Sequence, residues 1–242
     1  MKNLIIRALV AKKKLFIIFV AVCMAVSGMA QTYPTKFLGI PIDGTKASMI
    51  QKLQAKGFTY DKAHDCLTGQ FNGSSVHVYV VTNGNKVWRI MVADANRFSE
   101  GEIRIRFNDL LRQFRKNQKY IPLNDKDYRL SENEDISYEM TINNKRYSAE
   151  FLQITYELDS AFVYSTLVES IKSANEKTGE SFSLDSLSES ERQELLSPLF
   201  ELARLYAFEK NKVWFLINEF YGEYYISIYY DNEYNKADGE DL

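Results

Sequence analysis

Cysteine is nearly absent from this sequence. The 242 residues include only Cys23 and Cys66, and Cys23 lies in an apolar run close to the N-terminus. If that run is removed by processing, Cys66 has no partner and no internal disulfide can form. Stability must then come from a packed hydrophobic core, for which a chain of this length is sufficient.

Several familiar sequence motifs are also absent. The chain contains no Walker loop and no G-x-G-x-x-G, G-x-S-x-G or H-E-x-x-H sequence. These absences argue against P-loop, Rossmann, α/β-hydrolase and zincin chemistry. A carboxylate pair of the glycosidase type is not excluded, because its two acids need not be near each other in sequence.

The few residues with reactive side chains form no recognisable site. Cys66 with His64 or His77 has the composition of a nucleophile and its base, but no protease signature surrounds it. A buried or indifferent thiol is the favoured interpretation. The adjacent side chains of His64, Asp65 and Cys66 are poorly placed to bind one metal ion together.

Two acidic stretches resemble the start of a calcium-binding loop. They are Asp125-x-Asp127 and Asp231-x-Glu233-x-Asn235. An EF-hand loop needs Gly at its sixth position and Glu at its twelfth, and both stretches lack this pattern. We therefore predict solvated charge at both places, and we expect no catalytic, cofactor-binding or metal-binding residue in the chain.

The sequence has no apolar run of about 20 residues, the length that spans a bilayer. Its N-terminal run, residues 15–26, follows a basic start without acids and precedes small residues at Gly28 and Ala30. This layout predicts a secretory signal peptide over residues 1–30, cleaved after Ala30. The mature protein is then exported, periplasmic or secreted, with no membrane span; an uncleaved anchor is the alternative.

Basic residues are in the minority once the signal is removed. The predicted signal holds five of the 30 Lys and Arg residues and none of the 32 Asp and Glu residues, which leaves a net charge of −7. Binding to a phosphate backbone requires clustered Lys and Arg. The charge therefore argues against a nucleic-acid partner.

The distribution of apolar residues predicts an α+β fold, with antiparallel sheets and helices packed on them. Residues 31–120 read as a β-α-β-β-β-α module, residues 121–135 as an acidic linker, and residues 136–242 as a β-β-α-α-β-β module. We expect strands over 37–42, 67–71, 75–82, 86–93, 136–142 and 147–158, and helices after Thr45 or Ser48, after Ser99, from Ser160 and over 188–209. Asn72-Gly73, Asn83-Gly84 and Asn143-Asn144 mark turns, and Pro198 is expected to kink or restart the last helix.

The longest β-prone run is the closing hairpin, residues 212–231, which turns at Tyr221-Gly222. Its second strand alternates, so that Tyr224, Ile226, Ile228 and Tyr230 share one face and Tyr225, Ser227 and Tyr229 share the other. We expect the first set to be buried. Core packing is the favoured explanation for the tyrosines of this region. Tyr225 and Tyr229 are the candidate surface for a partner if that face is exposed.

Two stretches carry a resemblance to a known family. Phe37-Leu38-Gly39-Ile40-Pro41-Ile42-Asp43-Gly44 with Lys56-Gly57-Phe58, and the ending from Phe220 through Gly239-Glu240-Asp241-Leu242, resemble a family of exported proteins from Gram-negative gut anaerobes. That family has no assigned activity, so the resemblance gives no residue a role. The order of the first module is also similar to that of β-lactamase-inhibitor-like domains, which bind proteins through a sheet face.

These observations predict an exported, non-enzymatic binding or envelope-associated protein. Its partner is an unknown protein or glycan. The alternative is a periplasmic hydrolase that acts on glycan or peptide. A cleft with a carboxylate cluster or a Cys66–His pair favours the enzyme, whereas an exposed aromatic sheet face without such a cluster favours binding.

Overall fold

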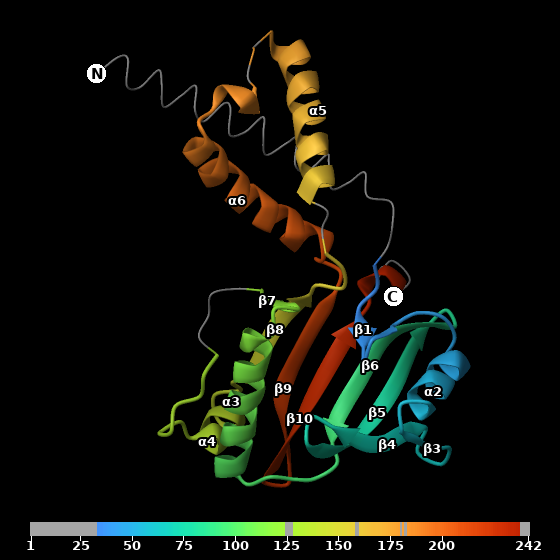
Figure 1. Ribbon diagram of the computed structural model, residues 1–242. Helices are drawn as coiled ribbons and strands as arrows, with labels where there is room; N and C mark the ends of the chain where they lie inside the picture. Colours follow the sequence, from blue (N-terminus) through green and yellow to red (C-terminus); the bar gives the residue numbers. More distant parts are fainter. Residues whose placement is uncertain (1–32, 124–127, 158–159, 180, 182, 238–242) are drawn as a thin grey trace. The chain divides into compact units, whose positions relative to one another are not determined.

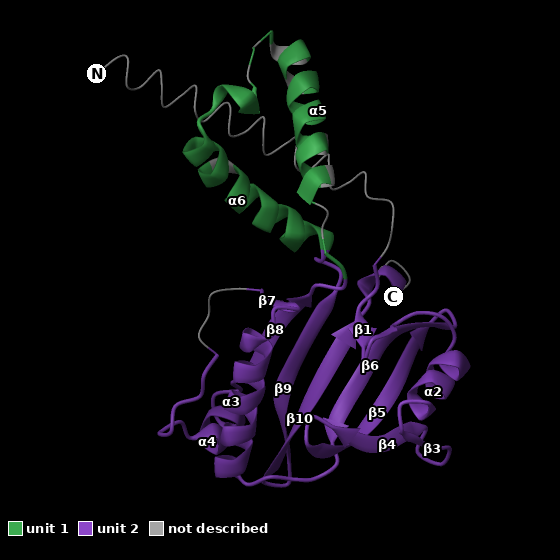
Figure 2. Ribbon diagram, viewed as in Figure 1, with its two compact units in different colours: residues 1–32, 156–207 green, residues 33–155, 208–242 purple. Residues whose placement is uncertain are grey.

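The computed structural model describes residues 33–123, 128–157, 160–179, 181 and 183–237. It divides into two compact units, coloured in Figure 2. A sheet unit is built from Tyr33–Thr155 and Phe208–Leu242, and the described part of the other unit, Tyr156–Ala207, is helical. The helical segment is thus inserted in sequence between two strands of the sheet unit. The predicted signal, residues 1–30, lies outside the described residues.

The sheet unit is organised around one eight-stranded antiparallel sheet (Figure 1). The strand order is β3-β4-β5-β6-β10-β9-β8-β7, so the closing hairpin lies beside the central meander. The strands are β3 (Thr59–Asp61), β4 (Cys66–Phe71), β5 (Ser74–Asn83), β6 (Lys86–Asp94), β7 (Tyr120–Pro122), β8 (Ser148–Gln153), β9 (Lys212–Phe220) and β10 (Glu223–Asp231). The α+β class predicted from sequence is confirmed, but the strands of both expected modules join in a single sheet.

Tight turns at positive φ connect the hairpin strands. Asn72-Gly73 and Tyr221-Gly222 each have two residues with positive φ, as a type I′ turn requires. Between β5 and β6 the turn residues are Gly84 and Asn85, one position later than predicted, because Asn83 pairs with Lys86. The expected single strand over 37–42 is a small hairpin, β1 (Lys36–Phe37) and β2 (Ile40–Pro41), which turns at Leu38-Gly39.

Helices pack on one face of the sheet. Helix α2 (Lys46–Gln54) begins at the N-cap Thr45 and buries Met49 and Leu53. Helix α3 (Glu100–Lys116) begins with the predicted Ser99–Glu102 capping box and buries five apolar residues at helical spacing. They are Ile103, Phe107, Leu110, Leu111 and Phe114. An ion pair between Arg106 and Asp94, with Asp94 also accepting from the Ile226 amide at 3.0 Å, ties α3 to the centre of the sheet.

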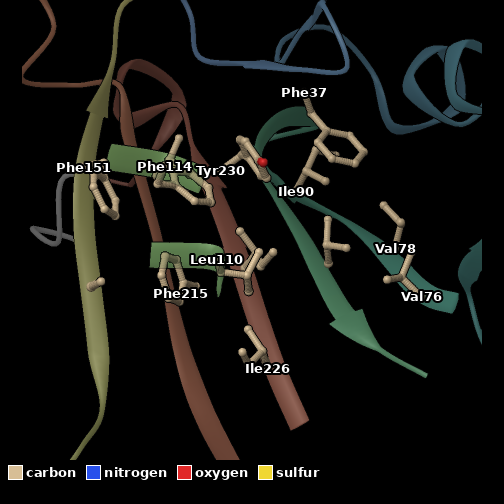
Figure 3. Close-up of a cluster of buried hydrophobic side chains, with 14 of the residues drawn as sticks. Phe37, Val76, Val78, Ile90, Leu110, Phe114, Phe151, Phe215, Ile226 and Tyr230 are labelled. Carbon is tan, nitrogen blue, oxygen red and sulfur yellow. The ribbon is translucent and has the colours of Figure 1, made fainter. Parts of the chain in front are cut away.

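One hydrophobic cluster joins the helices to the sheet. Figure 3 shows the side chains of Phe114, Phe151, Phe215 and Tyr230 gathered on this face. The rings of Phe107 and Phe215 meet at a centroid distance of 5.1 Å, and Phe151 stacks on Phe114 at 5.0 Å. The β10 residues predicted to be buried, Tyr224, Ile226, Ile228 and Tyr230, are 2, 1, 2 and 4 % exposed, which confirms that prediction.

The expected hairpin over residues 136–158 is wrong. Ile136–Thr141 forms a short helix, α4, whose N-cap Asp135 accepts a hydrogen bond from the amide of Tyr138. Ile136 and Met140 pack against the hydrophobic cluster, and they are four residues apart, as on one face of a helix. Only β8 remains as a strand in this region, and its partners are β7 and β9.

The expected linker, residues 121–135, does not coincide with the boundary between the compact units, which lies at 155/156 and 207/208. Its described part packs on α3. The side chain of Asn108 donates to the carbonyl oxygen of Leu130 and accepts from the Leu130 amide, both at 2.9 Å. Leu130 itself is buried in the hydrophobic cluster.

The helical unit has a core of its own. Helix α5 (Ser160–Thr178), a 3₁₀ turn η1 (Leu184–Ser186) and helix α6 (Glu189–Ala207) pack around Leu167, Ile171, Leu184 and Ala203. Helix α6 runs through Pro198 as one element, so of the two expectations for Pro198, a kink or a restart, the restart is wrong. None of the helices described in either unit combines the length and apolar character needed to cross a membrane.

Candidate functional site

The face of the sheet opposite α2, α3 and α4 carries the aromatic residues that the sequence singled out. We call it the open face, because the buried side chains of these helices belong to the cluster on the other face. The strand register places its side chains in rows across five strands. They are Thr68 (β4), His77 and Tyr79 (β5), Arg89, Met91 and Ala93 (β6), Tyr225, Ser227, Tyr229 and Asp231 (β10), and Trp214, Leu216 and Asn218 (β9).

One end of the open face holds an arginine among aromatic rings. Arg89 forms a bidentate ion pair with Asp231, at 2.6 Å from each of Nε and Nη2. The indole Nε1 of Trp214 donates to the same carboxylate at 3.0 Å. The guanidinium carbon lies 4.2 Å from the ring centroid of Trp88 and 5.0 Å from that of Tyr229. Asp231 is 4 % exposed, so this end is a closed, mutually satisfied cluster.

Tyr229 belongs to this cluster. Its ring stacks on the ring of its cross-strand neighbour Trp214, with centroids 4.1 Å apart and planes 11° apart. A ring whose face is covered in this way has little free surface for a ligand. Its packing therefore favours a structural role for Tyr229 over the partner contact that the sequence proposed for it.

Tyr225 lies at the other end of the open face, where its neighbours are different. The guanidinium of Arg97 lies 4.1 Å from the Tyr225 ring centroid and 4.9 Å from that of Phe220. Phe220 and its neighbour Tyr221, at the tip of the β9–β10 hairpin, are 52 and 89 % exposed. Tyr225 itself is only half-buried, so aromatic surface at this end is accessible.

Small side chains separate the two ends. Ser227 lies between Tyr225 and Tyr229 along β10, and it pairs across the sheet with Ala93. The amide Nδ2 of Asn218 donates to the Ser227 hydroxyl at 2.9 Å. The open face thus has a closed arginine cluster at one end, a small polar centre, and the accessible group Arg97, Phe220, Tyr221 and Tyr225 at the other. We call this group the tip cluster.

Arg89 and Arg97 were not singled out by the sequence reasoning. The sequence did contain a signal for the cluster around Arg89, because Asn-Lys-Val-Trp occurs at both 85–88 and 211–214. The two tryptophans of this repeat both lie near the guanidinium of Arg89. No comparable signal marks Arg97, which is held near Tyr225 by the bridge between its neighbour Phe98 and Tyr224 of β10.

The structure brings Cys66 and His77 together but leaves His64 apart. The Cys66 sulfur lies 4.0 Å from Nδ1 of His77, whereas the His64 ring is exposed and contacts Asp61 at 2.7 Å. Burial, followed by the charges of Asp61 and Asp65, raises the pKa of the Cys66 thiol. A nucleophilic cysteine needs a lowered pKa, so this environment disfavours a reactive thiolate.

The acidic stretches do not assemble a metal site in the described part of the chain. Asp231 is taken up by Arg89, Glu233 contacts Lys212 at 3.2 Å, and Asn235 donates to Asp43 and to the Val87 carbonyl. Asp125 and Asp127 lie outside the described residues. For Asp231, Glu233 and Asn235, the contacts support structural roles.

The helical unit contains a pocket of about 550 Å³ between α5 and α6. Its lining is mostly apolar. The charged residues in the lining are Glu189, Arg192 and Glu201. Glu201 is paired with Arg204 at 2.8 Å. The pocket is a space left between two packed helices. Its lining residues do not form a recognisable catalytic or ligand-binding group.

Comparisons of the chain with protein families, with curated proteins and with solved structures return no match. The case for function therefore depends on the geometry of the open face and of the Cys66–His77 pair.

Proposed function

We propose that this protein is an exported, non-enzymatic binding or envelope-associated protein that contacts its partner through the open face of the sheet. The observation that carries the proposal is the tip cluster. It combines accessible aromatic rings with an arginine on one face, and Tyr and Arg are enriched among the residues that dominate binding energies. The charged start and apolar core of residues 1–30 support the exported location.

The first test measures binding to the cell envelope. Mature protein, beginning at Gln31, is mixed with isolated envelope and sedimented, and the bound fraction is compared among variants. We expect Tyr225→Ala with Arg97→Gln to reduce the bound fraction by about tenfold or more, since each 1.4 kcal/mol is a factor of ten in affinity. Tyr138→Ala, which removes an exposed tyrosine of α4, is the matched control. Equal binding of all variants contradicts the proposal.

The location has a separate test. Intact-mass measurement of exported material is expected to give a chain that begins at Gln31. A mass that retains residues 1–30, or one with acyl chains on Cys23, contradicts processing after Ala30.

A periplasmic hydrolase is the second candidate, and the contact between Cys66 and His77 is the observation in its favour. The raised pKa of the thiol weighs against it. Loss of a glycan- or peptide-cleaving activity in folded Cys66→Ser protein supports the hydrolase over the binding protein.

A further inference from the structure

The tip of the β9–β10 hairpin carries a residue that is unfavourable for the fold. Tyr221 has a φ of 53° and Gly222 has a φ of 79°, which define the two central positions of a type I′ turn. Such positions strongly favour Asn, Asp and Gly, and a bulky side chain with positive φ is strained. The Tyr221 side chain is also 89 % exposed, so little burial compensates for the strain. Strained backbone positions occur disproportionately at binding and catalytic sites, so this outlier makes the hairpin tip a place to look for a function.

The neighbours of Tyr221 form an aromatic corner. The rings of Phe220 and Tyr221 have centroids 4.5 Å apart and planes at 78°, so they stand nearly perpendicular. Arg97 lies over the Phe220 and Tyr225 rings. Two apolar ring surfaces and a cation thus meet at one end of the open face.

Arg97 has unused hydrogen-bonding capacity. Among the residues that the structure describes, no hydrogen bond or ion pair involves its guanidinium, whereas Arg89 and Arg106 each form a bidentate ion pair with a carboxylate. A guanidinium stacked on aromatic rings keeps its N–H groups at its edge, where they can donate to a ligand. The tip cluster therefore offers apolar faces and free donors together.

The surrounding charge restricts the ligand. Glu219 and Glu223 flank the tip and are both exposed, and the mature chain has an excess of acidic residues. Polyanions, including nucleic acid and anionic lipid surfaces, are repelled by such an arrangement. A pyranose sugar fits it, because one face of the ring presents C–H groups to an aromatic ring while its hydroxyls accept from Arg97 and donate to Glu223.

We propose that the tip cluster is a binding site for a neutral saccharide, with Tyr221 stacking on a pyranose ring, the nearly perpendicular Phe220 ring contacting the edge of that ring, and Arg97 bonding its hydroxyls. This proposal rests on the function proposed above and names the class of its ligand.

The test is electrophoresis of the mature protein through native gels that contain soluble β-glucan, mannan, galactan or xylan. We expect retardation by at least one of these polymers. Tyr221→Asn and Arg97→Gln should each weaken it by about tenfold or more, a loss of about 1.4 kcal/mol. Asn suits the turn, so Tyr221→Asn should melt at the same temperature as the wild type or higher. Tyr138→Asn should be retarded as the wild type is.

Three outcomes overturn the saccharide proposal. They are a lack of retardation by all four polymers, retardation that Tyr221→Asn leaves unchanged, and stronger retardation by polygalacturonate than by any neutral polymer. If the envelope binding described above remains sensitive to Tyr225 and Arg97 while no polymer is bound, the ligand class is wrong and the binding function stands. Loss of that binding after protease treatment of the envelope then indicates a protein partner. If neither assay shows binding, both proposals fail.

Discussion

The two faces of the central sheet differ in what holds them together. On the covered face, β10 contributes Tyr224, Ile226, Ile228 and Tyr230, all nearly inaccessible and packed beneath helices. On the open face the same strand contributes two tyrosines that are only half-buried, and between them Ser227. The first face is stabilised by apolar burial. The second is held by hydrogen bonds, an ion pair and stacked rings, and it leaves one end accessible.

The two faces do not differ simply in that one is buried and the other exposed, and Asp231 shows this. It lies on the open face, yet its carboxylate is buried and accepts from Arg89 and Trp214. Removing one partner of a buried ion pair leaves the other charge uncompensated, which typically costs 3–5 kcal/mol. We expect Asp231→Ala to lower the free energy of unfolding by about this amount, measured by denaturant melts.

A second pair of variants separates charge from shape. Asp231→Asn keeps an acceptor for the Trp214 indole and should cost less than Asp231→Ala. Replacing Arg89 and Asp231 together by Met and Leu should recover most of the stability, since apolar pairs often match buried ion pairs. If Asp231→Ala lowers the free energy of unfolding by less than about 1 kcal/mol, the ion pair at this end of the open face contributes less than its geometry indicates.

The covered face provides the next largest effect. Ile228 is 2 % exposed and lies in the hydrophobic cluster. Ile228→Ala removes buried methyl and methylene groups and leaves a cavity, for which the usual cost is about 2–5 kcal/mol. Denaturant melts of Ile228→Val, with an expected loss of about 0.5–1.5 kcal/mol, show whether the cost scales with the volume removed. No difference between the two variants contradicts tight packing there.

Much of this face was predictable from sequence, because it depends on local pattern. The alternation along residues 224–230, the Ser99–Glu102 capping box and the helical spacing from Ile103 to Phe114 all identify buried positions. These signals fix which side chains of an element point the same way. They carry no information about which strand lies next to which.

The rest depended on contacts distant in sequence. The pairing of β6 with β10, which makes one sheet of two expected modules, joins Ala93 to Ser227. Residues 136–142 alternate apolar and polar as a strand does, but Ile136 and Met140 also fit a helix turn, and short runs of this kind are ambiguous. The sequence therefore led to Tyr225 and Tyr229 as equals, whereas the structure stacks Tyr229 on its cross-strand neighbour Trp214 and places the exposed Arg97, from the loop after β6, over Tyr225.

That inequality predicts a small effect at Tyr225. Its ring is half-buried and contacts Arg97 through its face. Tyr225→Ala should reduce the free energy of unfolding by less than about 1.5 kcal/mol, whereas Tyr224→Ala, one position away on the covered face, should cost about 3–5 kcal/mol. Thermal and denaturant melts of the two variants give the comparison directly. Equal, large losses place both tyrosines in the core and remove the candidate binding surface.

The smallest effect on stability is expected at Cys66, on the open face of β4 beside His77. Cys66→Ala should change the free energy of unfolding by no more than about 1 kcal/mol, because it removes one buried sulfur atom but neither a disulfide nor an ion pair, and it places no hydroxyl in the buried position. The thiol itself reports its environment. Burial raises its pKa in the folded protein, so the neutral thiol contributes stability that is complete below the unfolded pKa and is lost as pH rises through the folded one.

Alkylation of Cys66 by iodoacetamide therefore should show a pH midpoint above that of the same cysteine in urea-unfolded chain, and it should be slower at neutral pH. His77→Ala should leave the midpoint raised, because burial is the larger cause. A midpoint below that of the unfolded chain, restored to normal by His77→Ala, demonstrates a thiolate–imidazolium pair. That result would favour the hydrolase over the binding protein as the function of the open face.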